Sequence, residues 1–333
     1  MTQPKRGLCG PVLLALGLAA SLGGCREEVP LGAWDSQQPE AVGSGGNGAS
    51  TVLTNTVSSA DTSTTGGGAA LPSCLAAATP GAFNAAGSGL GATEMASDWT
   101  WPAPVASMQW DLMVEREIER PSPEAGPTSG YYYAYQFSFL EGASGFLGIQ
   151  AEGGYQLEPP DSPVEFTKIA VFWLSGPPLA AELGDIAYPD ARVAPETVAG
   201  VSYLTIHARF DWQVCHTYRF RVAPHSSDAD GIWYGAWIED TQSGVETFLG
   251  RMLLPADAGP LAPFSVSRSL PIEFGAQTCD VPAPSSVLFG RPHTLEGDVQ
   301  AELERNRFVD PGCPSSRFTD FVGAVRHELG AGP

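Results

Sequence analysis

Hydrophobic and polar residues alternate along the middle of the chain. In the stretch HTYRFRV, Tyr218, Phe220 and Val222 alternate with more polar neighbours, and this period of two is typical of a half-buried β-strand. Turns rich in Ser, Asp and Gly separate this strand from an aromatic strand over residues 232–239 and a third strand over residues 245–254. The pattern predicts three antiparallel strands at the centre of a β-sandwich.

Further stretches with the same period lie on both sides of this region. Residues 131–140, YYYAYQFSFL, place aromatic rings on one face, which could belong either to the core or to a ligand platform. About ten predicted strands, with turn signals between them and no βαβ pattern, favour an all-β, two-layer antiparallel β-sandwich of the jelly-roll or lectin-like type over residues 97–333. Residues 298–308 fit a short helix, and residues 317–329 fit a strand or a helix. The other predicted strands cover residues 108–116, 146–150, 168–174, 201–212, 264–270 and 286–291.

The first 24 residues have the organisation of a bacterial export signal. Lys5 and Arg6 precede an apolar run over residues 12–22, which is too short for a permanent membrane span. The run ends in LGGC, which resembles the lipobox of bacterial lipoproteins. The resemblance implies removal of residues 1–24, acylation of Cys25 and a lipid anchor in a membrane of the cell envelope. The alternative is an ordinary cleaved signal with a chance cysteine.

Residues 25–96 are low in complexity and consist largely of Gly, Ser, Thr, Ala and Asn. Such a segment buries too little apolar surface to offset the entropy lost on ordering, so we expect a disordered, flexible tether between the lipid anchor and the sandwich. Arg26 follows Cys25, where some lipoproteins carry Asp as an inner-membrane retention signal. By this analogy, we expect the outer membrane or the cell surface as the location.

Acidic residues far outnumber basic ones. The chain has 17 Lys and Arg against 37 Asp and Glu, and removal of Lys5 and Arg6 with the leader leaves 15 against 37, a net charge of −22. This charge argues against nucleic acid as a partner and suits an extracellular domain. It leaves room for a structural Ca²⁺, and the turn DADG at residues 228–231 resembles the start of a calcium loop without its later ligands. No cofactor and no specific metal ligand are predicted.

Six segments between residues 110 and 292 form a series with a family resemblance. They are YQFSF, GFLGIQ, KIAVFWLSG, W-x-x-x-x-TYRFRV, WYGAWIEDTQSGVETFLGRMLLP and C-x-x-x-x-x-SSVLFGRP. Their order is similar to a family of secreted bacterial domains of unknown function, number three-four-seven-two among catalogued domains, whose members often sit beside carbohydrate-binding modules. The chain departs from the family pattern at Cys215 and His216, where the family has Gly. Because the family has no established activity, the resemblance implies a fold and a compartment rather than a mechanism.

Four cysteines remain when Cys9 and Cys25 are set aside with the leader and its lipid. An even number in an exported chain predicts two disulfides, and three pairings are possible. Cys215 and Cys279 both lie at strand-end turns of the family-like region, so we favour a bond between them. Cys74 and Cys313 would then form the second disulfide and tie the end of the tether to the C-terminal segment.

Motifs for common catalytic sites do not occur in the sequence of the predicted domain. It contains no G-x-S-x-G of a serine hydrolase, and His327-Glu328 lacks the second His of a zinc-binding H-E-x-x-H helix. Glu239 and Asp240 are the least arbitrary carboxylate pair for glycoside hydrolysis, although a solvated strand end explains them more simply. No catalytic residue is therefore assigned, and the sequence leans away from an enzyme.

The aromatic strand carries the remaining signal. Trp233 and Trp237 lie on one of its faces, and Arg219 and Arg221 lie on the neighbouring strand. Sugar rings stack on exposed aromatic faces and Arg donates hydrogen bonds to hydroxyl groups, so these four residues form the predicted ligand site. Alternatively, the two Trp side chains face the other sheet and fill the core, as aromatic residues of sandwiches often do.

The sequence thus favours a lipid-anchored, surface-displayed sandwich that binds an extracellular glycan without catalysis. The first alternative is a polysaccharide hydrolase or lyase on the same scaffold, and the second is an envelope or adhesion protein without a small ligand. The fold does not choose among them. Exposed Trp rings would favour binding, whereas convergent acids with a strongly shifted pKa would favour an enzyme.

Overall fold

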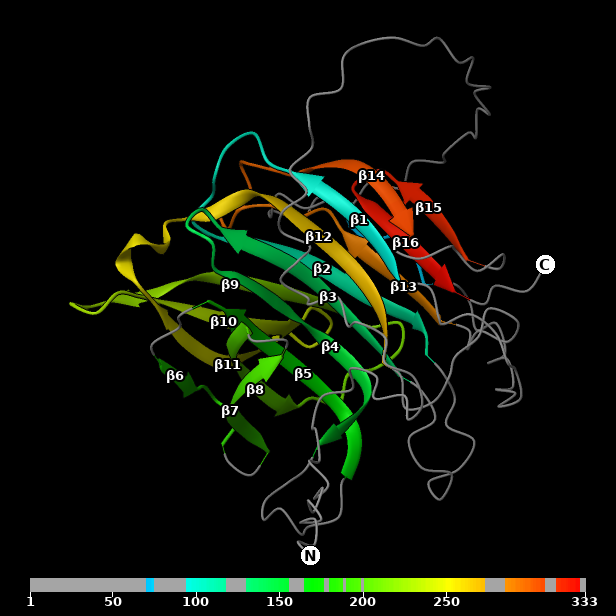
Figure 1. Ribbon diagram of the computed structural model, residues 1–333. Helices are drawn as coiled ribbons and strands as arrows, with labels where there is room; N and C mark the ends of the chain where they lie inside the picture. Colours follow the sequence, from blue (N-terminus) through cyan, green and yellow to red (C-terminus); the bar gives the residue numbers. More distant parts are fainter. Residues whose placement is uncertain are drawn as a thin grey trace, which may run out of the picture.

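The computed structural model describes residues 70–74, 94–117, 130–155, 165–176, 180–187, 190–198, 201–272, 285–308 and 316–329. Apart from a short 3₁₀ turn at Ala256–Ala258, the regular elements in these residues are β-strands. They form two eight-stranded sheets that pack face to face (Figure 1). The predicted two-layer antiparallel sandwich is confirmed.

The two layers are named here after one strand of each. The β3 sheet has the order β14-β1-β12-β3-β4-β5-β8-β7, and the β10 sheet has the order β15-β16-β13-β2-β9-β10-β11-β6. All neighbouring strands in both orders are antiparallel. The strands of the β3 sheet are β1 Met95–Thr100, β3 Gly130–Phe139, β4 Ser144–Tyr155, β5 Glu165–Ser175, β7 Ala191–Val198, β8 Val201–Arg209, β12 Leu261–Ile272 and β14 Glu302–Phe308. Those of the β10 sheet are β2 Met108–Arg116, β6 Ala180–Leu183, β9 Thr217–Ser227, β10 Ile232–Asp240, β11 Val245–Leu254, β13 Ser285–Gly290, β15 Arg317–Phe321 and β16 Ala324–Leu329.

The three predicted central strands are β9, β10 and β11, which are neighbours in this order in the β10 sheet. The C-terminal prediction of a helix over residues 298–308 is wrong, because this segment contributes the edge strand β14. Residues 317–329 form the hairpin of β15 and β16. The exposure of β14 explains the error: all of its side chains are at least partly exposed, so no clean period of two marks it as a strand.

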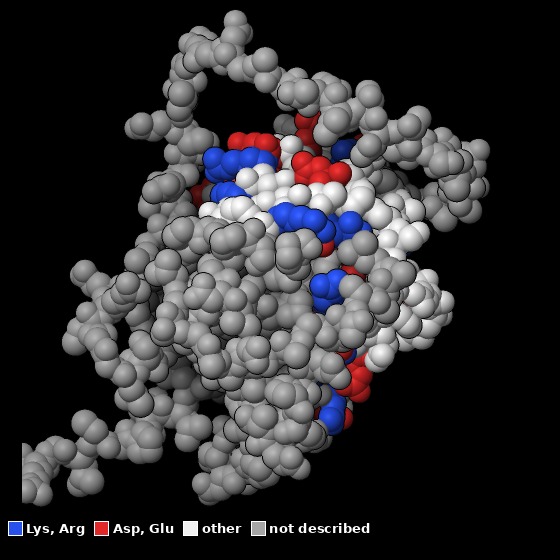
Figure 2. Space-filling view, turned by 90° about the vertical axis from the view of Figure 1, so that its right-hand side faces the viewer, with Lys and Arg blue, Asp and Glu red and all other residues white. Residues whose placement is uncertain are grey.

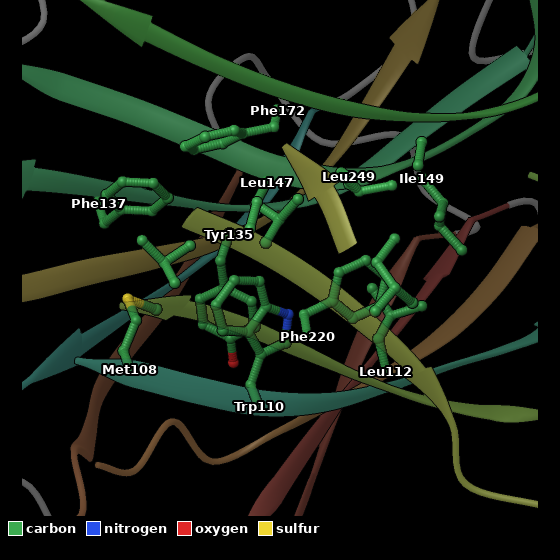
Figure 3. Close-up of a cluster of buried hydrophobic side chains, with 14 of the residues drawn as sticks. Met108, Trp110, Leu112, Tyr135, Phe137, Leu147, Ile149, Phe172, Phe220 and Leu249 are labelled. Carbon is green, nitrogen blue, oxygen red and sulfur yellow. The ribbon is translucent and has the colours of Figure 1, made fainter. Parts of the chain in front are cut away.

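Aromatic side chains from both sheets fill the core (Figure 3). Trp110 of β2 lies 4.7 Å from Tyr135 of β3 and 5.6 Å from Phe220 of β9, measured between ring centroids. All three side chains are fully buried. Aromatic contacts of this kind add to the stabilisation from buried area, so this cluster joins the two layers at their centre.

The tyrosine-rich strand β3 turns its inner face to this core. Four of its side chains are buried there: Tyr133, Tyr135, Phe137 and Phe139. The sequence left open whether this face belongs to the core or to a ligand platform, and in the structure it belongs to the core. The two Tyr hydroxyls also cross to β13 of the other sheet, where Tyr133 lies 2.6 Å from Ser285 Oγ and Tyr135 donates to the Gly290 carbonyl at 2.7 Å. Hydrogen bonds thus satisfy the polar ends of rings that are otherwise in apolar surroundings.

Ion pairs fasten the side of the sandwich that contains the C-terminal strands. Asp98 of β1 is fully buried and accepts hydrogen bonds from Arg305 and Arg307 of β14 at 2.7 and 3.0 Å. Glu115 of β2 accepts two parallel bonds from Arg326 of β16 at 2.7 and 2.8 Å. Figure 2 shows basic and acidic side chains next to one another on the described part of this side. A buried carboxylate is tolerated because it is paired in this way.

One disulfide, between Cys74 and Cys215, lies within the described residues and spans 141 positions of sequence. The predicted pairs Cys215–Cys279 and Cys74–Cys313 are therefore wrong. Cys215 stands at a turn with φ of 63° just before β9, and its N–H donates to the Val114 carbonyl, so it lies at the end of the sheet that residues 70–74 reach. The sequence indicated that Cys215 lies at the end of a strand, but it did not indicate at which end of the sandwich that strand ends. Cys279 and Cys313 lie outside the described residues.

Within these described ranges, no helix is long and apolar enough to cross a membrane. The leader, Cys25 and most of the predicted tether lie outside these ranges. Strand β1 begins at Met95, just before the start predicted for the sandwich.

Two fully buried histidines are expected to make stability fall in acid. Burial lowers the pKa of His327, which lies between the Ser97 and Ser269 hydroxyls at 2.8 and 3.0 Å, from 6.5 to about 3. Burial and then the charge of Arg192 lower the pKa of His207 to about 3. Between these pH values the unfolded chain binds protons that the folded chain does not, so stability is present above about pH 6.5 and is lost as the pH falls toward 3.

We predict that each histidine steepens the pH dependence of unfolding by up to about 1.4 kcal/mol per pH unit in this window. Urea denaturation of the wild type and of His327→Gln between pH 7 and pH 4 would measure it. The variant should lose less stability than the wild type over the same interval. Parallel curves for the two proteins would contradict the assignment of a neutral, buried imidazole to His327.

Candidate functional site

The outer face of the β10 sheet, which points away from the β3 sheet, carries the four residues of the predicted ligand site. On β10, Tyr234 and Ile238 belong to the core, whereas Trp233 and Trp237 do not. The strand alternates as the sequence predicted, and the reading in which the two Trp side chains fill the core between the sheets does not apply. Arg219 and Arg221 of β9 pair in register with Glu239 and Trp237 on the same face.

Trp237 is the centre of a cluster of rings. Its indole is partly exposed and lies over Gly235, at the place where any other residue would have a Cβ atom. Phe248 of β11 is 5.0 Å away, with ring planes 28° apart, and the guanidinium of Arg221 lies 4.3 Å from the indole centroid. Arg221 also donates to Glu246 at 2.9 Å, so both this ion pair and the contact with the indole hold its guanidinium in place.

His225 completes what we call the ring platform, which consists of Trp237, Phe248 and His225. The imidazole is exposed, lies 5.2 Å from Phe248 at 7° and lies 6.0 Å from Trp237 at 23°. Arg251 donates to His225 Nδ1 at 3.1 Å and holds the ring in this orientation. The three ring planes differ by no more than 28°, so their faces point in similar directions.

Two irregularities in strand pairing lie beside these rings. Between β9 and β10 the register shifts next to Trp233, which leaves His225 as an extra residue on β9. Between β10 and β11 the pairing is regular from the turn up to Phe248, which lies opposite Trp237, and it then shifts at Ala236, which leaves Leu249 as an extra residue on β11. A bulge re-aims the side chains beside it, so Phe248 and Arg251, which the simple period of two would separate, both contact His225 on the outer face.

Trp233 shares this face but takes no part in the platform. Its Nε1 donates to Asp228 Oδ2 at 2.8 Å, and the guanidinium of Arg251 lies 4.6 Å from its ring. The side chain is only 8% exposed. Arg251 itself is tied to Glu182 of β6 at 2.6 Å. Trp233 is therefore a covered ring that supports the turn before β10.

Arg219 lies to one side of the platform, in contact with carboxylates. It donates to Asp111 at 2.9 and 3.4 Å and lies 3.6 Å from Glu239. Of the four predicted residues, the structure therefore brings Trp237 and Arg221 together and places Trp233 and Arg219 in separate contacts. Sequence reasoning missed Phe248, His225 and Arg251, and only the alternation of Glu246 and Phe248 on β11 pointed to one of them.

The turn with the calcium-like sequence is closed by protein donors. Asp228 Oδ1 accepts from the backbone N–H groups of Asp230 at 2.9 Å and Gly231 at 3.2 Å, while Oδ2 accepts from Trp233. The hydrogen bond from Trp233, followed by that from Asp230, lowers the pKa of Asp228. Within the described part of the chain, no three His, Cys, Asp or Glu side chains gather as a metal site would require.

The carboxylate pair considered for hydrolysis is engaged in other interactions. Glu239 faces Arg219, and Asp240 accepts the backbone N–H of Gln242 at 3.0 Å. Burial acts to raise the pKa of Asp240, but hydrogen bonds from Gln242 and Ser243 outweigh it, and the pKa is lowered. A general acid needs a raised pKa, so this arrangement favours a turn-stabilising role for Asp240.

Comparison with models of known protein families finds no match, and comparison with curated proteins finds none either. The resemblance to secreted domains of unknown function remains a prediction from the sequence.

Replacing Gly235 tests how the platform is built. We predict that Gly235→Ala displaces the indole of Trp237, because the new Cβ meets the far end of that ring rather than backbone. The fold should persist, and the indole signal of Trp237 and the ring signals of His225 should move in ¹H–¹⁵N NMR spectra. Val245→Ala, at an exposed position on the adjacent strand, is the matched control and should leave both signals in place. Unchanged signals in Gly235→Ala would show that Trp237 does not rest on Gly235.

Proposed function

We propose that the outer face of the β10 sheet binds an extracellular glycan, without catalysis, through the ring platform. The observation that carries the proposal is the group of three nearly parallel rings on a solvent-facing sheet, flanked by Arg221 and Arg251. Apolar faces of sugar rings stack on aromatic rings, and guanidinium N–H groups donate to sugar hydroxyls. The partly exposed Trp237 and the exposed His225 are the residues that would meet the sugar.

The charges around the platform favour a neutral glycan. Arg221 and Arg251 are each paired with a carboxylate, Glu246 and Glu182 respectively. Asp185 adds another carboxylate at the edge, where it accepts the Phe248 N–H at 3.0 Å. Together with the overall excess of acidic residues, this arrangement would repel a polysaccharide rich in uronate or sulfate.

The proposal includes the location of the protein. The lipid on Cys25, the membrane of the cell envelope as its partner, and display at the outer membrane or cell surface remain predictions from residues outside the described ranges. The disulfide between Cys74 and Cys215 supports export, because disulfides persist in oxidising compartments. A tethered, surface-displayed module is well placed to meet a large glycan that cannot enter the cell.

The alternatives differ from this proposal in what they require of the same face. A polysaccharide hydrolase or lyase needs an acid or base with a pKa suited to proton transfer beside the rings, whereas Asp228 and Asp240 have lowered pKa values. An adhesion protein without a small ligand needs a broad surface for another protein. Loss of binding on removal of a single ring would distinguish a sugar platform from such a surface.

Binding to a glycan array tests the platform directly. We predict that the protein binds a neutral polysaccharide and that Trp237→Ala weakens this binding at least about tenfold, since a stacked ring contributes a large share of such affinity. Phe308→Ala removes an exposed ring from β14, an edge strand of the other sheet, and should bind as the wild type does. Both variants should be measured with and without Ca²⁺.

Full binding by Trp237→Ala would remove the platform from the proposal. Binding lost only after chelation of Ca²⁺ would move the site to the acidic turns. Release of shortened chains or unsaturated ends from the bound polysaccharide would establish the enzyme alternative in place of a binding role.

A further inference from the structure

The outer face of the β3 sheet, on the opposite side of the sandwich, carries a second set of aromatic rings. Tyr132, Phe146, Trp173 and Tyr203 lie on the neighbouring strands β3, β4, β5 and β8. Phe146 is 4.6 Å from Trp173, and Trp173 is 5.4 Å from Tyr203, with ring planes 30° and 35° apart. Tyr132 and Phe146 belong to an apolar cluster separate from the core between the sheets, and Trp173 packs against this cluster.

A strip of small side chains runs beside these rings. Ala134, Gly148 and Val171 are paired across β3, β4 and β5, and the next partner in the same row is His207 of β8. A Cβ at Gly148 would collide with the backbone of β3, so the strands approach each other closely there. The strip is therefore closely packed, with Ala134 and Val171 buried, while Trp173 beside it is partly exposed.

Polar atoms without a partner lie along the same face. His207 is 2% exposed, and neither ring nitrogen has a hydrogen-bond partner. The Thr205 hydroxyl, two residues earlier on β8 and fully buried, has none, and neither has the Oε1 atom of Gln136 on β3. Buried polar groups in folded proteins are nearly always paired, so three such residues on one face call for a ligand.

The chemistry of these atoms matches hydroxyl groups. Burial, with a smaller effect from Arg192, lowers the pKa of His207 to about 3, so the imidazole is neutral and has one donor and one acceptor. Arg192 of β7 is paired with His207 in the strand register, and Arg209 lies two residues after His207 on β8. Thr205 both donates and accepts, and Gln136 Oε1 accepts. A sugar hydroxyl also donates and accepts, whereas an apolar partner would leave all three unpaired.

The spacing indicates a ligand larger than one sugar. Gln136, Phe146, Trp173 and Thr205 occupy one row across β3, β4, β5 and β8. Three strand spacings separate the ends of this row, which is roughly 14 Å. Polar atoms at both ends with rings between them suit an oligosaccharide that stacks at its middle and hydrogen-bonds at its ends.

We propose that the outer face of the β3 sheet is a second saccharide-binding face, in which His207 and Thr205 bind hydroxyl groups of an oligosaccharide that stacks on Trp173. This inference is independent of the ring platform, because it depends on unpartnered buried atoms of the other sheet. Binding rather than proton transfer is its role, since an imidazole with so low a pKa is a weak base at neutral pH.

The test uses His207→Leu and Thr205→Val in the full-length chain. Replacing an unpaired buried polar group by an apolar one of similar size removes an energetic penalty, so each variant should melt at the same temperature as the wild type or higher. Each should also bind at least tenfold more weakly to one or more members of a panel containing β-glucan, mannan, galactan, polygalacturonate and alginate. In the wild type, the bound polysaccharide should shift the ¹⁵N signals of the His207 ring.

Three results would overturn the inference. A melting temperature several degrees lower in His207→Leu, with unchanged binding, would show that the imidazole has a structural role. Variants that melt and bind as the wild type does would show that these atoms contact no saccharide. Failure of the wild type to bind any panel member through this face, as judged by the His207 signals, would also exclude it, whether or not a protein partner then binds there.

The two sites can fail separately. If Trp237→Ala abolishes all binding and His207→Leu leaves binding unchanged, the ring platform alone is functional and the inference fails. If His207→Leu weakens binding and Trp237→Ala does not, the second face stands and the proposed platform fails. Losses restricted to different glycans in the two variants would establish both faces.

Discussion

The contact of Trp110 with Tyr135 across the two layers is the constraint on which the other features depend. Side chains of a strand alternate strictly, so once the inner rings of β2, β3 and β9 meet in the core, the direction of every other residue on those strands is set. Shifting a strand by one residue would expose these rings and bury charged neighbours. The outer faces of the sheets are thus a consequence of the core.

The ring platform lies where this strict alternation is interrupted. Regular pairing from the turn places Phe248 opposite Trp237, and the bulge beyond this pair brings Arg251 to the same face, where it donates to His225. The two bulges add one residue each to the outer strands of this trio and re-aim the side chains next to them. Gly250, which follows the extra residue Leu249 on β11, has a φ of 148°. Because Gly250 has no Cβ, the backbone of β6 can approach it closely, so the second bulge depends on a glycine at this position.

Features that depend on local alternation were predictable from the sequence, and features that depend on distant strands were not. The faces of β10, the inward direction of Phe220 and the sandwich itself follow from the period of two. The partner of Cys215 depends on which segments meet at one end of the sandwich, which no local pattern encodes. The contact of Arg251 with His225 required the positions of the bulges, and the isolation of His207 required the pairing of β5, β7 and β8.

The two outer faces differ in how their polar groups are satisfied, and this difference has a physical meaning. On the β10 sheet, Arg221, Arg251 and Arg219 all have carboxylate partners, so the charges of that face are balanced without a ligand, although Arg221 Nε has no hydrogen bond. On the β3 sheet, the unpaired atoms of His207 and Thr205 weaken the fold. A sequence could remove that penalty with apolar residues of similar size. Retaining polar residues there is costly for stability alone and is accounted for by a ligand that pairs with them.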